Sequence, residues 1–319
     1  MCYSLSTVER TFVAFTIILL AHAHAHAAPL PPTETAKFST TAQGPRGFAF
    51  ARQPVKPSSL RSGSQLAQSR TIYLNRDGAI LYPGDNDART SRSSIVESPT
   101  EITPWDIDDE TWEETVDCVK DLYARFDVTV TDVDPGNVPH LEAVFGGHPN
   151  DVGLPDNVAG VSPFTTDCST IENSVVFTFT DVLPDDSRLM CEVMAQEIAH
   201  SYGLDHEMLA SDPMTYLDYA GDRTFKDVMA SCGEFGNRMC GIEGSVCRER
   251  QNSVQLLESR LGVRGNPSGA PGSASEPSNT TEPEAGGCAA SGSRGGFLLP
   301  LLLLIRSRRS RRARTAPRR

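Results

Sequence analysis

Four closely spaced residues have side chains that suit a metal-dependent hydrolase, and a glycine between them allows the chain to turn. Gln196 and His200 lie four positions apart, so on a helix they share one face and can reach the same ion. Gly203 can end that helix in a left-handed conformation, after which the chain can bring His206 back toward the ion. Glu197 can approach a metal-bound water without binding the metal. A zinc ion would lower the pKa of that water toward neutrality, and Glu197 would accept its proton during attack on a carbonyl.

The segment 195–206 resembles the metzincin signature His-Glu-x-x-His-x-x-Gly-x-x-His, and its Gly-Leu-Asp-His end is similar to the matrixin version. The following Ser-Asp-Pro-Met-Thr-Tyr resembles the family's Met-turn, in which Met214 would lie beneath the metal. Tyr216 matches the family members in which a tyrosine stabilises the oxyanion of the transition state. The order of elements extends the resemblance over most of 69–264. It implies a zinc-dependent endopeptidase that holds one catalytic zinc ion and acts on protein or peptide substrates.

The first ligand position departs from this signature because it is Gln196 instead of histidine. An amide oxygen is neutral, harder and weaker toward zinc than imidazole nitrogen, so zinc affinity should fall. His140 and His148 are candidates to replace the missing ligand, although we expect each to be a solvated loop residue instead. Two functions therefore stay open. One is an active endopeptidase with Gln196 as a metal ligand, and the other is a catalytically silent domain that binds protein or cell-surface partners.

The same resemblance implies where a substrate would lie. An extended peptide would add to the edge strand of the sheet above the metal, for which 157–162 is the candidate segment. The pocket for a substrate side chain would follow the Met-turn, around 217–224. Structural calcium is left open by the many aspartates, although none of them form a loop with the ligand spacing of a known calcium site.

Apolar spacing predicts the elements that position these residues. Three- and four-residue repeats predict an amphipathic helix over 107–126 with its acidic residues outward, a site helix over 187–202 and a terminal helix over 254–261. A hairpin is predicted around 75–78. The predicted strands are 71–74, 79–82, 127–133, 141–145, 158–161 and 174–182. Together with the resemblance, they imply an α+β fold: a twisted, mostly parallel sheet with an antiparallel edge strand, one helix packed on it, the site helix and a C-terminal helix.

Cysteine usage and the N-terminus indicate export. Arg10, an apolar run over 11–20 and small residues up to Pro29 follow the plan of a secretory signal peptide over 1–27. A transmembrane anchor is the alternative, but about ten apolar residues are too few to span a bilayer. The six cysteines of the folded part predict disulfides with undetermined pairing. They are Cys118, Cys168, Cys191, Cys232, Cys240 and Cys247. A structural zinc site at Cys240 and Cys247 is the weaker alternative.

The C-terminal segment 288–319 resembles the sorting tail of myxobacterial surface proteins, in which a cysteine precedes an apolar run and an arginine-rich end. By this resemblance Cys288 is the processing or lipidation point, and the tail is the chain's only membrane contact. A disordered basic tail is the alternative. The residues 28–68 are expected to form a disordered spacer or pro-segment, and 265–287 a flexible linker. The expected location is the cell surface, the outer envelope or the extracellular space.

Net charge limits the partners of the chain. The formal charge is -12, and the last fourteen residues hold eight arginines and no acid, so the remainder carries -12 minus 8, or -20. Phosphate repulsion by this acidic part excludes a nucleic-acid binder. Acidic peptides would be disfavoured substrates for the same reason. We expect the protein to be a monomer.

Overall fold

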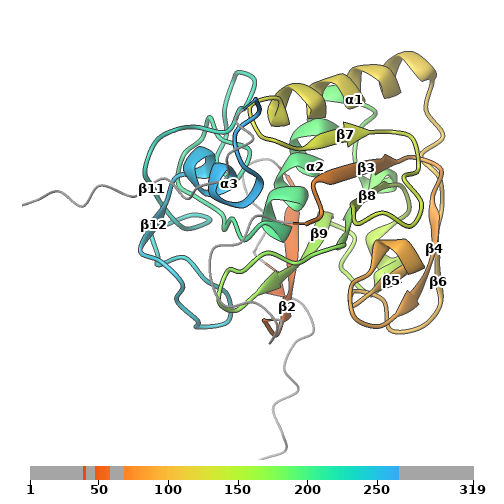
Figure 1. The fold of residues 1–319 in the computed structure, drawn as a ribbon, viewed down its shortest axis with the longest axis horizontal. Helices are drawn as coiled ribbons and strands as arrows, with labels where there is room; N and C mark the ends of the chain where they lie inside the picture. Colours follow the sequence, from red (N-terminus) through yellow and green to blue (C-terminus); the bar gives the residue numbers. More distant parts are fainter. Residues whose placement is uncertain (1–38, 41–46, 58–67, 266–319) are drawn as a thin grey trace, which may run out of the picture. The chain divides into compact units, whose positions relative to one another are not determined.

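The computed structural model describes residues 39–40, 47–57 and 68–265. The predicted signal peptide, most of the linker, Cys288 and the arginine-rich tail lie outside the described residues. Within the described part, no helix combines the length and the apolar character needed to cross a bilayer. Figure 1 shows helices α1 and α2 close to the central sheet, while α3 and the small β11–β12 sheet lie at the opposite end of the domain from strands β4, β5 and β6.

The central sheet has seven strands in the order β1-β2-β9-β10-β8-β3-β7. Four of its pairings are parallel, and β9 is antiparallel to β10, so the prediction of a mostly parallel sheet in a mixed fold is confirmed. The middle strands β8, β9 and β10 are rich in apolar residues because they are buried on both faces. The strands are β1 (Ser39–Thr40), β2 (Ala49–Val55), β3 (Thr71–Asn75), β7 (Thr129–Thr131), β8 (Leu141–Phe145), β9 (Val158–Thr165) and β10 (Val175–Thr178).

The hairpin predicted around 75–78 is wrong. Both edges of β3 are paired, with β8 on one side and β7 on the other, so β4 (Ala79–Pro83) cannot join it. Strand β4 instead pairs with β5 (Arg92–Ser93) and antiparallel with β6 (Thr100–Ile102) in a separate three-stranded sheet. The sequence between the two strands therefore changes the direction of the chain from one sheet to the other.

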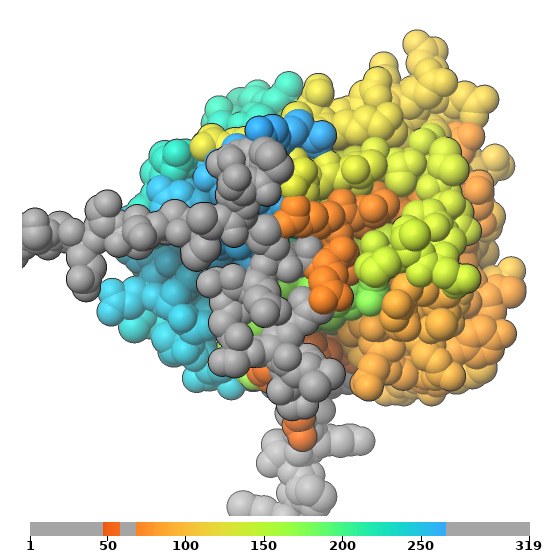
Figure 2. Space-filling view, viewed as in Figure 1, coloured from red at the N-terminus to blue at the C-terminus, as the bar shows by residue number. Residues whose placement is uncertain are grey.

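The predicted helices are all present. Helix α1 (Asp109–Tyr123) begins where the Asp108 side chain accepts a hydrogen bond from the Thr111 amide, and α2 (Ser187–Ser201) begins in the same way at Asp186. Helix α3 (Ser253–Leu261) is the predicted terminal helix. Helix α1 lies along one edge of the space-filling view in Figure 2, and its exposed residues are mostly acidic, as its amphipathic pattern predicts.

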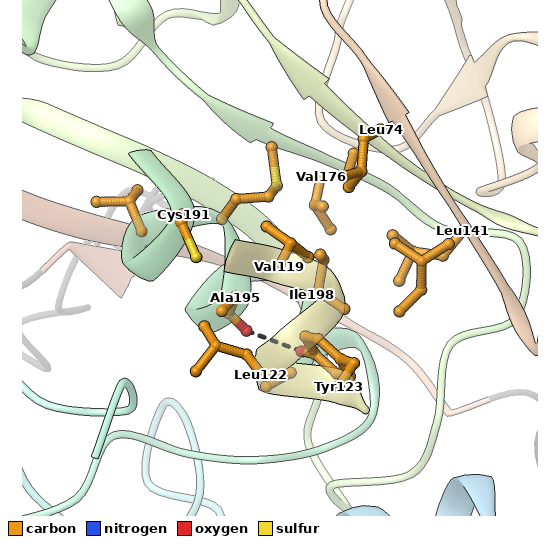
Figure 3. Close-up of a cluster of buried hydrophobic side chains, with 14 of the residues drawn as sticks. Leu74, Val119, Leu122, Tyr123, Leu141, Val176, Cys191, Ala195 and Ile198 are labelled. Atoms are coloured by element: carbon orange, nitrogen blue, oxygen red, sulfur yellow. Dashed lines mark hydrogen bonds between the residues drawn. The ribbon is translucent and has the colours of Figure 1, made fainter. Parts of the chain in front are cut away.

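The core joins α1 and α2 to the sheet. Buried side chains of both helices meet residues of β3, β8 and β10, as Figure 3 shows for Val119, Ile198, Leu141 and Val176. The hydroxyl of Tyr123 donates a hydrogen bond of 3.0 Å to the carbonyl oxygen of Ala195 in α2. This bond satisfies a polar group that would otherwise be costly to bury. The site helix is therefore held from α1 on one side and from the sheet on the other.

Three disulfides join the six cysteines of the folded part: Cys118–Cys191, Cys168–Cys247 and Cys232–Cys240. The predicted disulfide framework is confirmed, and it is typical of an oxidising environment. The first bond connects α1 to α2. The alternative of a structural zinc site at Cys240 and Cys247 is wrong, because the sulfurs of both residues are in disulfides and neither can provide a thiolate.

The segment 28–68, expected to be an unstructured spacer or pro-segment, contains an ordered strand. Residues Ala49–Val55 form β2, which pairs with β9 along seven residues. The folded unit therefore begins before residue 69. Strand β9 was expected to be the edge strand over 157–162, and this is wrong because β2 covers it. Apolar alternation did not reveal β2, since two of its buried residues are Arg52 and Gln53.

Candidate metal centre

Helix α2 places three of the predicted site residues in the interior of the domain. The side chains of Gln196, Glu197 and His200 are all buried from solvent. Polar residues in a helix that is otherwise apolar and enclosed are costly unless they have partners. Their burial marks this turn of α2 as a site rather than as ordinary core.

The end of α2 brings His206 back toward His200. Tyr202 is the C-cap of α2, and Gly203 follows with φ +84°, the left-handed conformation expected for it. A Cβ at Gly203 would also collide with the carbonyl oxygen of Cys168, so glycine is required there. The turn places the Nε2 atoms of His200 and His206 3.0 Å apart.

The second ring nitrogen of each histidine has a partner that determines its tautomer. Nδ1 of His200 lies 2.7 Å from the carbonyl oxygen of Leu204, which can only accept, so Nδ1 carries the proton. Nδ1 of His206 lies 2.9 Å from Oε1 of Glu234. Burial alone would raise the pKa of Glu234, but hydrogen bonds from His206 and Arg238 lower it, so the carboxylate is ionised and Nδ1 of His206 donates. Both Nε2 atoms therefore carry lone pairs.

Two lone pairs that face each other repel unless a positive charge lies between them. Burial lowers the pKa of both histidines, and the charge of Arg52 acts in the same direction, so protonation of either ring is disfavoured. A cation bound by both Nε2 atoms resolves the conflict. Two nitrogens bound to one zinc ion in tetrahedral geometry lie roughly 3.3 Å apart, close to the separation observed.

Gln196 and Glu197 have polar atoms without partners. Among the described residues, nothing bonds to the amide oxygen or nitrogen of Gln196, or to either carboxylate oxygen of Glu197. Burial raises the pKa of Glu197 well above its usual range, although the charge of Arg52 opposes this. An unpaired buried carboxylate and an unpaired buried amide are rare in folded proteins and point to a ligand or a reaction. The amide oxygen of Gln196 is thus free to act as a third metal ligand.

The predicted Met-turn is hydrogen-bonded to the residue that follows His206. Met214 is buried, its amide donates to Asp212, and its carbonyl oxygen accepts from the amide of Glu207, next to His206. The ring of Tyr216 lies 4.8 Å from the ring of His206, edge to face. The structure therefore places Tyr216 beside His206 and links Met214 to the residue that follows His206. The hydroxyl of Tyr216, however, accepts from the amide of Phe50 and donates to its carbonyl oxygen, at 2.8 and 3.0 Å.

An ionic network that sequence reasoning missed surrounds His206. Asp205 accepts hydrogen bonds from Arg52, Arg238 and the amide of Gly241, and Arg238 also bonds to Glu234. Burial opposes ionisation of Asp205, but the charges of Arg52 and Arg238 lower its pKa below the usual range. Asp205 lies inside the recognised motif, so its proximity to the site was readable from the sequence. Arg52 and Glu234 come from distant segments that carry no motif.

The structure also brings together two groups of residues with the atom types that hold metal ions. Asp205, His206 and Glu234 form one, and Asp205 with Cys232 and Cys240 forms the other. The second is closed to metal because its two sulfurs are bonded to each other. In the first, the carboxylates already bind arginines, and Glu234 binds the Nδ1 face of His206. Such carboxylates orient a metal-binding histidine rather than bind the metal themselves.

His140 and His148 do not replace the missing histidine ligand. Nδ1 of His140 is bonded to the carbonyl oxygen of Val138, and its ring packs against Tyr73. His148 caps the short helix Pro149–Val152, where its Nδ1 accepts from the amide of Asn150. Both histidines are committed to local structure in other parts of the chain, and the expectation of a solvated loop position is wrong for His140, which is buried.

A surface pocket adjoins the loop after the Met-turn. Four of its lining residues, Asp218, Tyr219, Ala220 and Arg223, lie within the predicted 217–224 segment, and Leu189 and Phe48 complete it. Arg223 is fixed by ion pairing with Glu192, at 2.6 Å, and by a bond to the carbonyl oxygen of Leu217. Helix α2 thus holds this loop as well as the candidate metal ligands.

The comparisons with family models and with curated proteins find no relative of this chain. No protein-family model matches the chain, and no curated protein matches it either. The geometry of the site is therefore what supports a function.

Proposed function

We propose that this protein is an exported zinc-dependent endopeptidase of metzincin type. The observation that carries the proposal is the pair of facing Nε2 atoms of His200 and His206, each with its Nδ1 committed as a donor. The buried side chains of Gln196 and Glu197, which have no partner among the described residues, lie on α2 together with His200. The site helix α2 and the terminal helix α3 support the proposal, since the resemblance implies both.

The donor set fits one zinc ion. His200 and His206 would bind it through Nε2, and Gln196 through its amide oxygen. Bound zinc supplies a Lewis acid and a water whose pKa is near neutrality. Leu204 and Glu234 orient the two imidazoles through their Nδ1 protons. The weakest member of the set is Gln196, because an amide oxygen is a poor zinc ligand.

The remaining chemistry belongs to Glu197 and Tyr216. The carboxylate of Glu197 packs against Gly160 of β9, at the inner side of the strand that would bind substrate. With no other partner among the described residues, it is available to accept a proton from the attacking water and to transfer it to the leaving amine. The Tyr216 hydroxyl can donate to a developing oxyanion once it is free of Phe50.

A catalytically silent, partner-binding domain is the second candidate, and Gln196 is the observation that favours it. If the amide oxygen binds zinc too weakly, the domain keeps its fold but does not hydrolyse peptides. Export and attachment through Cys288 are compatible with either function, and the three disulfides support export.

Zinc stoichiometry of the full chain, purified with its disulfides formed and without chelator, tests the proposal. About one zinc per chain, lost in His200→Ala and retained in the control His148→Asn, supports a metal centre at α2. The control is matched because Asn retains helix capping at position 148. A value near zero that does not rise in micromolar zinc contradicts the enzyme and favours the silent domain. Restoration of both zinc and peptide hydrolysis by Gln196→His alone would show that Gln196 has inactivated the site.

A further inference from the structure

A second surface pocket lies where β12 (Arg250–Gln251) meets α3, at the end of the domain away from β5 (Figure 1). Its volume of about 230 Å³ is below the roughly 300–1,000 Å³ of pockets that hold drug-sized ligands. None of its lining residues is acidic, and the polar ones are Arg248, Arg250, Gln251, Asn252, Gln255 and Ser259. The pocket therefore suits a small ligand that carries negative charge.

The two arginines of this pocket have no carboxylate partner within the described part of the chain. The guanidinium of Arg248 donates to the carbonyl oxygen of Gly203, and that of Arg250 donates to the carbonyl oxygen of Met229. Most other arginines of the domain are in ion pairs with aspartate or glutamate. Because a guanidinium has five N–H donors, both arginines retain donors for a ligand.

The charge of Arg248 is costly in this position. Burial lowers the pKa of Arg248 to about 10, and the charge of Arg260 acts in the same direction, while Asp205 opposes them only in part. Asp205 is itself bound by Arg52 and Arg238. Nε of Arg248 is buried and has no hydrogen-bond partner among the described residues. Since a buried charge without a counter-charge destabilises a fold, an anion beside Arg248 would stabilise this one.

The inner wall of the pocket is held by the turn that leads to His206. The side-chain amide of Gln251 accepts from the backbone N–H of Asp205 at 2.9 Å and donates to its carbonyl oxygen at 2.6 Å. Arg248 is held at Gly203 in the same turn. A ligand therefore meets two side chains that are already ordered, which removes part of the entropy cost of binding.

The charge and the donors of the pocket indicate the class of its ligand. Two guanidinium groups match the two negative charges of a phosphate or sulfate group, and each can donate two parallel N–H bonds to its oxygens. Without its last fourteen residues the chain carries -20, so an extended polyanion is repelled and a single oxyanion group is favoured. We propose that this pocket binds a phosphate or sulfate group, with Arg248 and Arg250 as its main contacts. The site is independent of zinc and of peptide hydrolysis.

Thermal unfolding of the full chain in phosphate, sulfate or acetate, matched in ionic strength with sodium chloride, tests the proposal. A ligand that binds the folded state alone raises the melting temperature with its concentration, which yields an affinity. We expect Arg250→Gln to weaken phosphate and sulfate binding about tenfold to a hundredfold, the usual effect of losing hydrogen bonds from a charged group. Arg250 is exposed, so this variant should keep its fold.

Arg92→Gln is the matched control. Arg92 is also an exposed arginine of a short strand that donates to a backbone carbonyl, that of Pro83, but it lies in β5 at the other end of the domain. General stabilisation by phosphate and sulfate salts acts on both variants alike, so the difference between them reports the pocket. Equal phosphate affinities of Arg250→Gln and Arg92→Gln would overturn the proposal. So would acetate binding as tight as phosphate binding, or a melting temperature that none of the three anions raises.

Glucose 6-phosphate distinguishes the two sources of such a group. If this ester binds as tightly as inorganic phosphate and loses affinity in Arg250→Gln, the ligand is a phosphorylated sugar. If only the inorganic ions bind, with the same dependence on Arg250, the pocket is a site for the free anion. Either result upholds the proposal, and neither depends on whether α2 holds zinc.

Discussion

The Nε2 atoms of His200 and His206 lie 3.0 Å apart although neither is the hydrogen-bond donor of its ring. Each imidazole is oriented from its far side, one by a backbone carbonyl and the other by Glu234. This arrangement orients both rings toward a common point, and it makes that point unfavourable without a cation.

Glu234→Gln should weaken zinc binding about tenfold to a hundredfold, which is the usual effect of removing an outer partner of a metal-binding histidine. The amide can still accept from His206, so the loss is mainly of charge. Competition with a chromophoric chelator measures the affinity. Glu258→Gln is the control, since this carboxylate pairs with Arg125 far from the site in sequence and at the surface. Equal affinities in the two variants would contradict the role of Glu234.

Glu197→Gln should reduce peptide hydrolysis about a hundredfold to ten-thousandfold, the usual contribution of a general base, while the zinc content stays the same. In the metal-free protein, the same change should raise the melting temperature, because it removes an ionisable group that burial disfavours and that has no partner among the described residues. Calorimetry and a peptide assay on one preparation separate the two effects. Loss of zinc together with activity would instead identify Glu197 as a ligand.

Acid should loosen the loop after the Met-turn through Glu192. Burial opposes the ionised form of this residue, but hydrogen bonds from Arg223 and Arg188 outweigh it and lower its pKa. A lowered folded-state pKa stabilises the fold above the usual value of 4.5, and this contribution is lost as pH falls below it. Glu192→Gln should therefore flatten the acid limb of stability below pH 4.5, as measured by urea denaturation. An unchanged limb would contradict the assignment.

The disulfides should differ in what they stabilise. Cys118–Cys191 spans 73 residues and joins α1 to α2, and replacing both cysteines with alanine should lower the free energy of unfolding by about 4.5 kcal/mol. Cys232–Cys240 spans 8 residues, and its removal should cost only about 2.5 kcal/mol. The loop closed by Cys232–Cys240 carries Glu234 and Arg238, however. Removal of this disulfide should therefore weaken zinc binding more than removal of Cys118–Cys191. Urea denaturation measures the loss of stability in both double variants, and zinc titration measures their loss of zinc affinity. The variant that loses more stability should lose less zinc affinity.

Local sequence patterns predicted the elements whose structure depends on their own residues and not on distant partners. The apolar spacing of α2 and the glycine at its end located the site helix, and the mostly apolar residues of β8 predicted its bounds. Strand β2 was missed because Arg52 is buried through Asp205 and Glu234, 153 and 182 residues away, and no local pattern encodes such a pair. The partners of β4 were missed because pairing depends on which strand edges are already occupied.

Gly160 should be required for the position of Glu197. A Cβ at Gly160 would lie 2.8 Å from Oε1 of Glu197 and 2.8 Å from the carbonyl oxygen of Phe177, closer than real Cβ contacts allow. Because the backbone of β10 cannot yield easily, we expect Gly160→Ala to displace the Glu197 carboxylate and to reduce peptide hydrolysis by about a hundredfold, as misplacement by about 1 Å commonly does. Gly236→Ala is the matched control, since a Cβ there meets nothing within 4 Å. Zinc content should stay unchanged in both variants, so equal hydrolysis rates would show that Glu197 does not depend on this contact.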